Sequence, residues 1–307
     1  EIRLSLVGSE MCIRDSFLTV VLERAFNMRD GFGREIDYMR ISVIDSCNLN
    51  CYYCNPCDNN EHCHALNILS VKEVLCIVRA ATRLGIKHFR LTGGEPLLHP
   101  QLDEMVLQIK KIPGVSSVSL TTNAVLLVQH AKWLKEAGID SINVSLDTID
   151  ASEYERITKK PLLEEVKHGI NAAIECGIRV KINVVLTPQT DVVALTRYVA
   201  KKGTDIRFIE MMPVGEGHTN GVEPYKKVIG TLSKLYGEPC RINTEKTKEI
   251  NSGNDKRKIP DNGPAEYYIF PELGIRVGLI QAIHGKFCDT CNRIRVTADG
   301  RLMPCLG

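Results

Sequence analysis

Short apolar runs alternate along this chain with longer stretches in which apolar residues recur every three to four positions. The short runs predict β-strands and the longer stretches predict amphipathic helices, because these are the repeat lengths of the two structures. We expect strands near residues 39–44, 88–92, 117–121, 141–145, 179–186 and 205–210. We expect helices near residues 71–84, 101–111, 128–137, 162–176 and 191–202.

Local signals mark several helix ends. The run Ser70-Val71-Lys72-Glu73 has the pattern of a capping box and predicts a helix start. Gly85, Gly138 and Gly177 stand where three of the helices are expected to end. The segment 222–236 closes a sixth strand–helix unit.

Six strand–helix units predict a parallel sheet with right-handed crossovers. A closed barrel of this kind has eight units. We therefore expect an α/β fold, an open partial (βα)6 barrel formed by residues 28–236.

The last third of the chain has a different pattern. Residues 241–263 are polar and predict a loop, and short strands are expected near 266–270 and 275–280. Ala298-Asp299-Gly300-Arg301 predicts a turn between two further short strands. We expect residues 237–307 to form a small C-terminal extension of the barrel.

The first 27 residues stand apart from the rest. The chain begins with Glu1, and residues 1–27 lack the charged-then-apolar layout of a secretory signal. Met28 opens the segment that leads into the first strand. We interpret residues 1–27 either as a non-native extension, translated upstream or vector-derived, or as a disordered one.

Length and composition exclude several classes. A chain of 307 residues forms one large domain, or one domain with a small addition, at about 100–200 residues per domain. The net charge of +2 is too small to indicate a nucleic-acid partner or an anionic membrane. No apolar run approaches the roughly 18–20 residues of a membrane span. We expect a cytoplasmic protein.

Twelve cysteines are the most informative part of the composition, because eight of them lie in two clusters. The first cluster holds Cys47, Cys51, Cys54, Cys57 and Cys63; the second holds Cys288, Cys291 and Cys305; Cys12, Cys76, Cys176 and Cys240 stand alone. Without a secretory signal, a disulfide framework is not expected in so long a chain. Clustered thiols instead predict metal or redox chemistry.

Cys47, Cys51 and Cys54 directly follow the first predicted strand. Three thiolates within eight residues suit three irons of a [4Fe–4S] cluster. The fourth iron would keep an open position for a small molecule, as a catalytic zinc does. A structural zinc site with His62 or His64 as fourth ligand, or a set of reactive thiols, is the alternative.

Polar residues follow the strands at the edge where the Cys loop lies, which is the working face of such barrels. In Thr92-Gly93-Gly94-Glu95-Pro96 the two glycines allow a ligand to approach the backbone, and Glu95 suits an ammonium group. The other residues at or near strand ends are Thr121, Thr122, Asn123, Lys181, Asn183, Ser145 and Met212. Any one of them has an ordinary reading as a turn residue, whereas their recurrence on one face favours a binding site.

A CxxxCxxC loop after the first strand, followed by GGEP after the second, resembles the radical S-adenosylmethionine (SAM) superfamily. From Met28 to the end, the chain resembles the GTP 3',8-cyclase family of molybdenum cofactor biosynthesis. This resemblance rests on Phe32-Gly33-Arg34 and on the runs LTGGEPLL, TTN, NVSLD, RFIEMMP, GPAEYY and FCDTCNRIRVTADGRLMPCL.

The resemblance implies a barrel of the radical SAM type and two [4Fe–4S] clusters, with SAM bound to the open iron of the first. The 5'-deoxyadenosyl radical formed from SAM would take hydrogen from C3' of the GTP ribose, and the carbon radical would add to C8 of guanine. The product would be (8S)-3',8-cyclo-7,8-dihydroguanosine 5'-triphosphate. Cys288, Cys291 and Cys305 match the second cluster of the family, although the residues alone also allow a zinc knuckle completed by His284.

Matched position by position, SAM-binding residues would be Tyr53, Gly94, Ser145 and Met212. GTP-binding residues would be Arg40, Arg90, Thr121, Lys181, Arg293 and Arg295. Arginine forks and a lysine point charge suit a triphosphate, although singly Arg40, Arg90 and Lys181 would be ordinary strand-end charges. The family also implies an electron donor of the flavodoxin or ferredoxin type and a homodimer as partners.

The sequence departs from the family at several positions. Asn55 replaces a Met, Ala124 replaces a Gly in the usual TTNG, and residues 213–216 are short and lack a Trp. The chain also stops at Gly307, before the Gly-Gly tail of the family, which predicts a fragment or an inactive protein as given. The rival readings are another radical SAM enzyme with an auxiliary cluster, such as a peptide-modifying one, a zinc-binding module, and an inactive nucleotide-binding paralogue.

Overall fold

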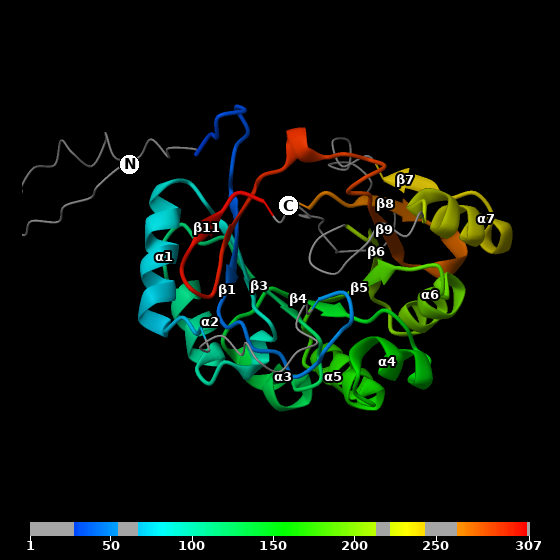
Figure 1. The fold of residues 1–307 in the computed structure, drawn as a ribbon, viewed down its shortest axis with the longest axis horizontal. Helices are drawn as coiled ribbons and strands as arrows, with labels where there is room; N and C mark the ends of the chain where they lie inside the picture. Colours follow the sequence, from blue (N-terminus) through cyan, green and yellow to red (C-terminus); the bar gives the residue numbers. More distant parts are fainter. Residues whose placement is uncertain (1–27, 55–66, 213–221, 243–262, 306–307) are drawn as a thin grey trace, which may run out of the picture.

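The computed structural model describes residues 28–54, 67–212, 222–242 and 263–305 (Figure 1). Expectations for the following positions lie outside the described residues: residues 1–27, Asn55, Cys57, His62, Cys63, His64, residues 213–216, most of the predicted loop 241–263, and Gly307.

Six parallel strands form the centre of one curved sheet and lie side by side in chain order. They are β1 (Tyr38–Ser42), β2 (His88–Thr92), β3 (Ser117–Thr122), β4 (Ser141–Ser145), β5 (Val180–Leu186) and β6 (Asp205–Glu210). The helices that cover the outer face are α1 (Val71–Arg83), α2 (Leu102–Lys110), α3 (Leu127–Glu136), α5 (Leu163–Glu175) and α6 (Val192–Lys201) (Figure 1). Each lies within two residues of its predicted bounds, so the expected open α/β barrel is confirmed.

The alternation along each strand separates an apolar face from a polar one. In β1, Met39 and Ile41 are buried under the helices, whereas Tyr38 and Arg40 point to the opposite face. The same alternation recurs in the neighbouring strands. The inner face of the curved sheet is therefore polar, and it is this face that can receive a ligand.

The predicted helix signals have their expected geometry. The Ser70 hydroxyl accepts from the backbone N–H of Glu73 at 3.3 Å, and the Glu73 carboxylate accepts from the N–H of Ser70 at 2.8 Å. Gly85, Gly138 and Gly177 have φ angles of 90°, 88° and 68°, which is the left-handed region expected after a helix end.

Among the described residues, one α-helix was not predicted. Helix α4 (Ala151–Thr158) is short, and Asp150 caps it by accepting from the N–H of Glu153 at 2.8 Å. The Asp-x-x-Glu spacing is a signal that could have indicated it. Its C-terminal turn supports the Cys loop, because the carbonyl oxygens of Ile157 and Thr158 accept from the N–H groups of Tyr52 and Asn50.

The C-terminal region extends both edges of the barrel sheet. Strand β9 (Arg276–Ile280) pairs parallel with β6, and β10 (Arg293–Val296) pairs parallel with β1. Residues 281–292 therefore cross from one edge of the sheet to the other, and they carry Cys288 and Cys291 (Figure 1). Both parallel pairings escaped prediction, because strand periodicity does not indicate which edge a strand joins.

The remaining elements complete these two edges. Strand β8 (Glu266–Ile269) pairs antiparallel with β9, and β7 (Cys240–Ile242) pairs with β8. The predicted loop start at residue 241 is wrong, because residues 241 and 242 belong to β7. The segment from η2 (Tyr225–Ile229) to α7 (Gly230–Tyr236) is helical as expected.

The predicted turn at 298–301 is confirmed between β10 and β11 (Leu302–Met303), with Gly300 at a φ of 82°. In the described part of the chain, no helix combines the length and the apolar character needed to cross a bilayer.

Candidate active site

The first Cys loop leaves β1 at its carboxyl end. Cys54 donates its N–H to the carbonyl oxygen of Cys51 at 3.0 Å, and this turn brings the two thiols into hydrogen-bonding contact. The amide of Asn123, after β3, donates to Cys47 Sγ at 3.8 Å. All three cysteines are free of disulfide bonds. Burial raises the pKa of Cys47, so the thiol form is favoured until a metal replaces the proton.

Gly93 and Gly94 pack against the backbone that enters the Cys loop. A Cβ atom on Gly94 would lie 2.2 Å from the carbonyl oxygen of Ser46, and one on Gly93 would lie 2.4 Å from that of Ile44. Gly94 donates its N–H to Ile44 at 2.8 Å, and Glu95 donates to Ser46 at 2.8 Å. The two glycines thus allow two segments of the protein to meet, and the approach of a ligand to their backbone stays a prediction.

Glu95 is a buried connection between β2 and β3. One carboxylate oxygen accepts from the Thr122 hydroxyl at 2.7 Å and from the N–H of Leu97 at 3.0 Å. The other accepts from the N–H of Asn123 at 2.7 Å. Burial raises the pKa of Glu95 in opposition to these bonds. Three protein donors occupy three of the roughly four acceptor positions of this carboxylate, and the contact with an ammonium group stays a prediction.

Asp147 fixes Tyr53, one of the residues expected to contact SAM. The Tyr53 hydroxyl donates to one Asp147 oxygen, and the N–H of Val185 donates to the other at 2.7 Å. Burial raises the pKa of Asp147 to about 6, although both hydrogen bonds act in the opposite direction. Asp147 was missed as a site residue, even though it ends the run NVSLD.

Four arginines from three neighbouring strands gather on the inner face. Arg40 of β1 is in register with Arg90 of β2 on one side and with Arg295 of β10 on the other. Burial and the charges of Arg90, Arg295 and Arg293 lower the pKa of Arg40 to about 9. Nε of Arg40 has no hydrogen-bond partner within the described residues. Such a set of like charges favours the binding of an anion.

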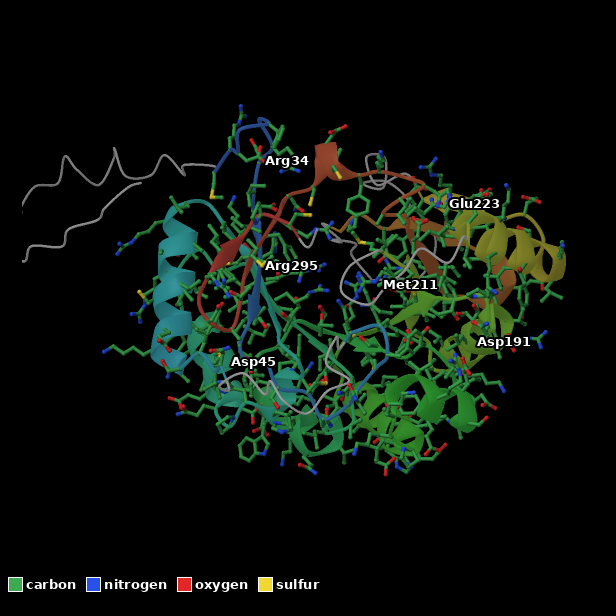
Figure 2. All side chains as sticks on the ribbon, viewed as in Figure 1. Arg34, Asp45, Asp191, Met211, Glu223 and Arg295 are labelled. Atoms are coloured by element: carbon green, nitrogen blue, oxygen red, sulfur yellow. The ribbon has the colours of Figure 1, made fainter. Side chains whose placement is uncertain are left out.

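The surroundings of Arg90 and Arg293 hold them in place. Arg90 donates to the Ser119 hydroxyl at 3.1 Å, and its guanidinium lies 5.6 Å from the ring centre of Tyr38. The guanidinium of Arg293 lies 5.7 Å from the ring centre of Phe287. Figure 2 shows Arg295 and Met211 on opposite walls of the curved sheet.

A second polar row crosses β3, β4 and β5. Thr121 is in register with Asn143, and Asn143 with Lys181. Lys181 is only 5% exposed, and its Nζ lies 5.9 Å from the ring centre of Tyr267. Predicted site residues Thr121 and Lys181 are therefore brought together, and Asn143 between them was not singled out from sequence.

The remaining expected residues lie at strand ends. Ser145 ends β4 and is exposed, and Met212 follows β6 and is half-buried. Ala124 has a φ of 66°, so the TTNA turn keeps a left-handed residue without the glycine that would favour it.

The second Cys group lies where residues 281–292 join β10. Cys291 donates its N–H to the carbonyl oxygen of Cys288 at 3.2 Å, and Cys305 follows β11. Burial lowers the pKa of Arg295, while the nearby Cys305 thiol acts in the opposite direction. All three cysteines are free of disulfide bonds. Cys305 is thus close enough to Arg295 to act on the pKa of its guanidinium.

His284, the residue that would complete a zinc knuckle, is engaged by another partner. Its Nδ1 is bonded to Glu210, which also accepts from the N–H of Ile283 at 2.8 Å. This contact fixes residues 281–292 to the end of β6. Within the described ranges, no group of three or more His, Cys, Asp or Glu side chains is spaced to hold a single metal ion.

Comparison with known proteins identifies two matching family models. The Radical SAM superfamily model matches residues 41–195, and the Molybdenum Cofactor Synthesis C model matches residues 204–307. A protein of Clostridium perfringens (strain SM101) named GTP 3',8-cyclase is 37% identical over 282 residues, which are 91% of this chain and 83% of that protein. A protein of the same name from Pelotomaculum thermopropionicum is 38% identical over 286 residues, which are 91% of this chain and 84% of that protein.

Solved structures agree on the fold. Streptococcus suis SuiB bound to the precursor peptide SuiA has a TM-score of 0.65 at 14% identity, covering 98% of this chain and 67% of that one. Methylornithine synthase (PylB) has a TM-score of 0.53 at 14% identity, and the match covers 74% of this chain and 71% of that one. At such identities the likeness concerns the fold alone, and it confirms the partial barrel of radical SAM type.

Proposed function

The chain belongs to the GTP 3',8-cyclase family of the radical SAM superfamily, and we propose that it converts GTP to (8S)-3',8-cyclo-7,8-dihydroguanosine 5'-triphosphate. This reaction is the first step of molybdenum cofactor biosynthesis. The observation that carries the proposal is the row of Arg90, Arg40 and Arg295 on the inner face of the sheet, whose strand β1 leads into the first Cys loop.

Membership of the superfamily implies a [4Fe–4S] cluster and SAM. Cys47, Cys51 and Cys54 would hold the cluster: the three thiols come from one short loop, and two of them already touch. When bound, this cluster supplies the electron that cleaves SAM to methionine and a 5'-deoxyadenosyl radical. Tyr53, Gly94, Ser145 and Met212 are the residues that we assign to SAM. Asp147 would hold Tyr53 in place for that contact.

A second [4Fe–4S] cluster is proposed at Cys288, Cys291 and Cys305. The support is the placement of these free thiols beside Arg293 and Arg295, the two arginines of β10. A ligand held at such a cluster would lie next to the arginine row.

GTP would be held by Arg40, Arg90, Thr121, Lys181, Arg293 and Arg295. Burial of Arg40 among like charges costs free energy in the ligand-free protein, and a triphosphate offsets that cost by supplying several negative charges. The protein's task is then to fix the ribose near the SAM site and to exclude water from it. An electron donor of the flavodoxin or ferredoxin type and a homodimer are further proposals from the family.

The test is anaerobic reconstitution with iron and sulfide, followed by SAM, a reductant and GTP. We expect 5'-deoxyadenosine to form with a cyclised nucleotide, and to depend on GTP. Equal 5'-deoxyadenosine formation with and without GTP, and no nucleotide product, would overturn the assignment of GTP as substrate.

A further inference from the structure

Asn143 occupies the middle of β4, between two residues that we assign to GTP. Its register partners are Thr121 on β3 and Lys181 on β5. The neighbours of Asn143 along the strand, Ile142 and Val144, are fully buried in the apolar core. Because side chains alternate along a strand, Asn143 points to the opposite, inner face together with Thr121 and Lys181.

The side chain of Asn143 is buried with its donor unused. It is 1% exposed, and Nδ2 has no hydrogen-bond partner within the described residues. A buried amide without an acceptor destabilises a fold, whereas an apolar residue of similar size would not. The unpaired amide at this position therefore points to an acceptor outside the described residues, supplied by a ligand.

The neighbours define the chemistry of that acceptor. Lys181 provides a positive charge on one side, and the Thr121 hydroxyl provides a second donor on the other. The row of Arg90, Arg40 and Arg295 lies on the same face, two residues closer to the strand starts. Arg90 pairs with Ser119, which is two residues before Thr121 on β3. Donors and cations that converge in this way suit an anionic oxygen.

We propose that Asn143 is a further substrate-binding residue, which donates from Nδ2 to a phosphate oxygen of the nucleotide. The inference rests on the proposed function, since it takes the triphosphate of GTP as the ligand. Asn143 would discriminate between a nucleoside triphosphate and a nucleoside, in contrast to residues that contact the base. SAM also carries acceptor oxygens, so its binding must be measured separately.

The test compares Asn143→Asp and Asn143→Ser in the reconstituted holoenzyme with the wild type. Asp has the same shape but lacks both N–H donors and adds a negative charge, while Ser keeps a shorter donor. We measure the dissociation constants of GTP, guanosine and SAM by anaerobic equilibrium dialysis. Asn143→Asp is expected to weaken GTP binding by about tenfold to a hundredfold, and Asn143→Ser by less. Guanosine and SAM affinities should change less than twofold.

A matched control is Asn171→Asp on helix α5, where the Asn171 side chain accepts from Lys202 Nζ at 2.7 Å on the outer layer. This variant should bind GTP as the wild type does. Unchanged GTP affinity in Asn143→Asp and Asn143→Ser, an equal loss for guanosine, or a loss confined to SAM would each overturn the inference. In those cases GTP binding by the wild type leaves the proposed function standing. A wild-type holoenzyme that binds no GTP would overturn both.

Discussion

The Arg34 guanidinium donates to the backbone carbonyl oxygen of Cys288 at 2.6 Å, across 254 positions of the sequence. Asp30 orients Arg34 by accepting from its Nε at 2.6 Å. The segment before β1 therefore supports the loop that carries Cys288 and Cys291. Phe32-Gly33-Arg34 contributed to the resemblance, but only the structure gives Arg34 this role.

Arg34→Ala is expected to weaken the second cluster. Loss of a residue that orients a ligand loop costs about 10- to 100-fold in metal affinity. Iron content after reconstitution and desalting should fall toward that of one cluster, while the spectroscopic signal of the first cluster persists. Arg29→Ala is the control, since Arg29 pairs with Glu35 at an exposed position. Full iron content in Arg34→Ala would show that the contact is dispensable.

Glu95→Ala should destabilise the ligand-free chain by about 3 kcal/mol or more, because three donors lose their acceptor in a buried site. Urea unfolding followed by circular dichroism measures the change. Glu104→Ala, at an exposed position of α2, should have little effect. A loss for Glu95→Ala no larger than that for Glu104→Ala would contradict the role of Glu95 in joining β2 to β3.

The raised pKa of Asp147 should make the free energy of unfolding depend on pH. Its folded pKa of about 6 lies above the ordinary value of 3.8, so the cost of ionising it is absent below about pH 4 and complete above about pH 6. Asp147→Asn removes this cost. Its free energy of unfolding, relative to the wild type, should therefore rise between these pH values by at most about 3 kcal/mol.

Asp150→Asn is the control, because the pKa of Asp150 is shifted in the opposite direction to that of Asp147. Hydrogen bonds from Ser152 and from the N–H of Glu153 lower the pKa of Asp150. Its carboxylate therefore stabilises the fold above its ordinary pKa, and this contribution is lost as the pH falls. With rising pH, the relative free energy of unfolding of Asp147→Asn should rise between about pH 4 and pH 6, whereas that of Asp150→Asn should fall below about pH 4 and stay level above it. Parallel slopes would contradict the assignment for Asp147.

Arg40→Met should change stability and binding in opposite directions. Because the folded pKa of Arg40 is about 9, well below its ordinary value, its charge destabilises the ligand-free fold below about pH 9, and this cost fades at higher pH. At pH 7 the variant should be about 1–2 kcal/mol more stable in thermal unfolding. It should bind GTP at least about tenfold more weakly. Arg79→Met, exposed on α1, should do neither. A variant that binds GTP normally would remove Arg40 from the site.

Sequence periodicity was sufficient for the six strand–helix units, because each depends on residues that are close along the chain. Relationships between distant residues were not predictable in this way. Glu210 and His284 are separated by 74 positions, and β10 joins β1 from the far end of the chain. Short motifs identified the cysteines, whereas Asp147, Asn143 and the partners of Glu95 emerge only when neighbouring strands are placed in register.

The proposed reaction begins with removal of the hydrogen at C3' of GTP. The most direct measurement uses GTP labelled with deuterium at C3', with the reconstituted protein, SAM and a reductant, and follows the label by mass spectrometry. We expect 5'-deoxyadenosine that carries one deuterium and a cyclised nucleotide that has lost it. Unlabelled 5'-deoxyadenosine, with the label retained in GTP, would contradict the proposed reaction.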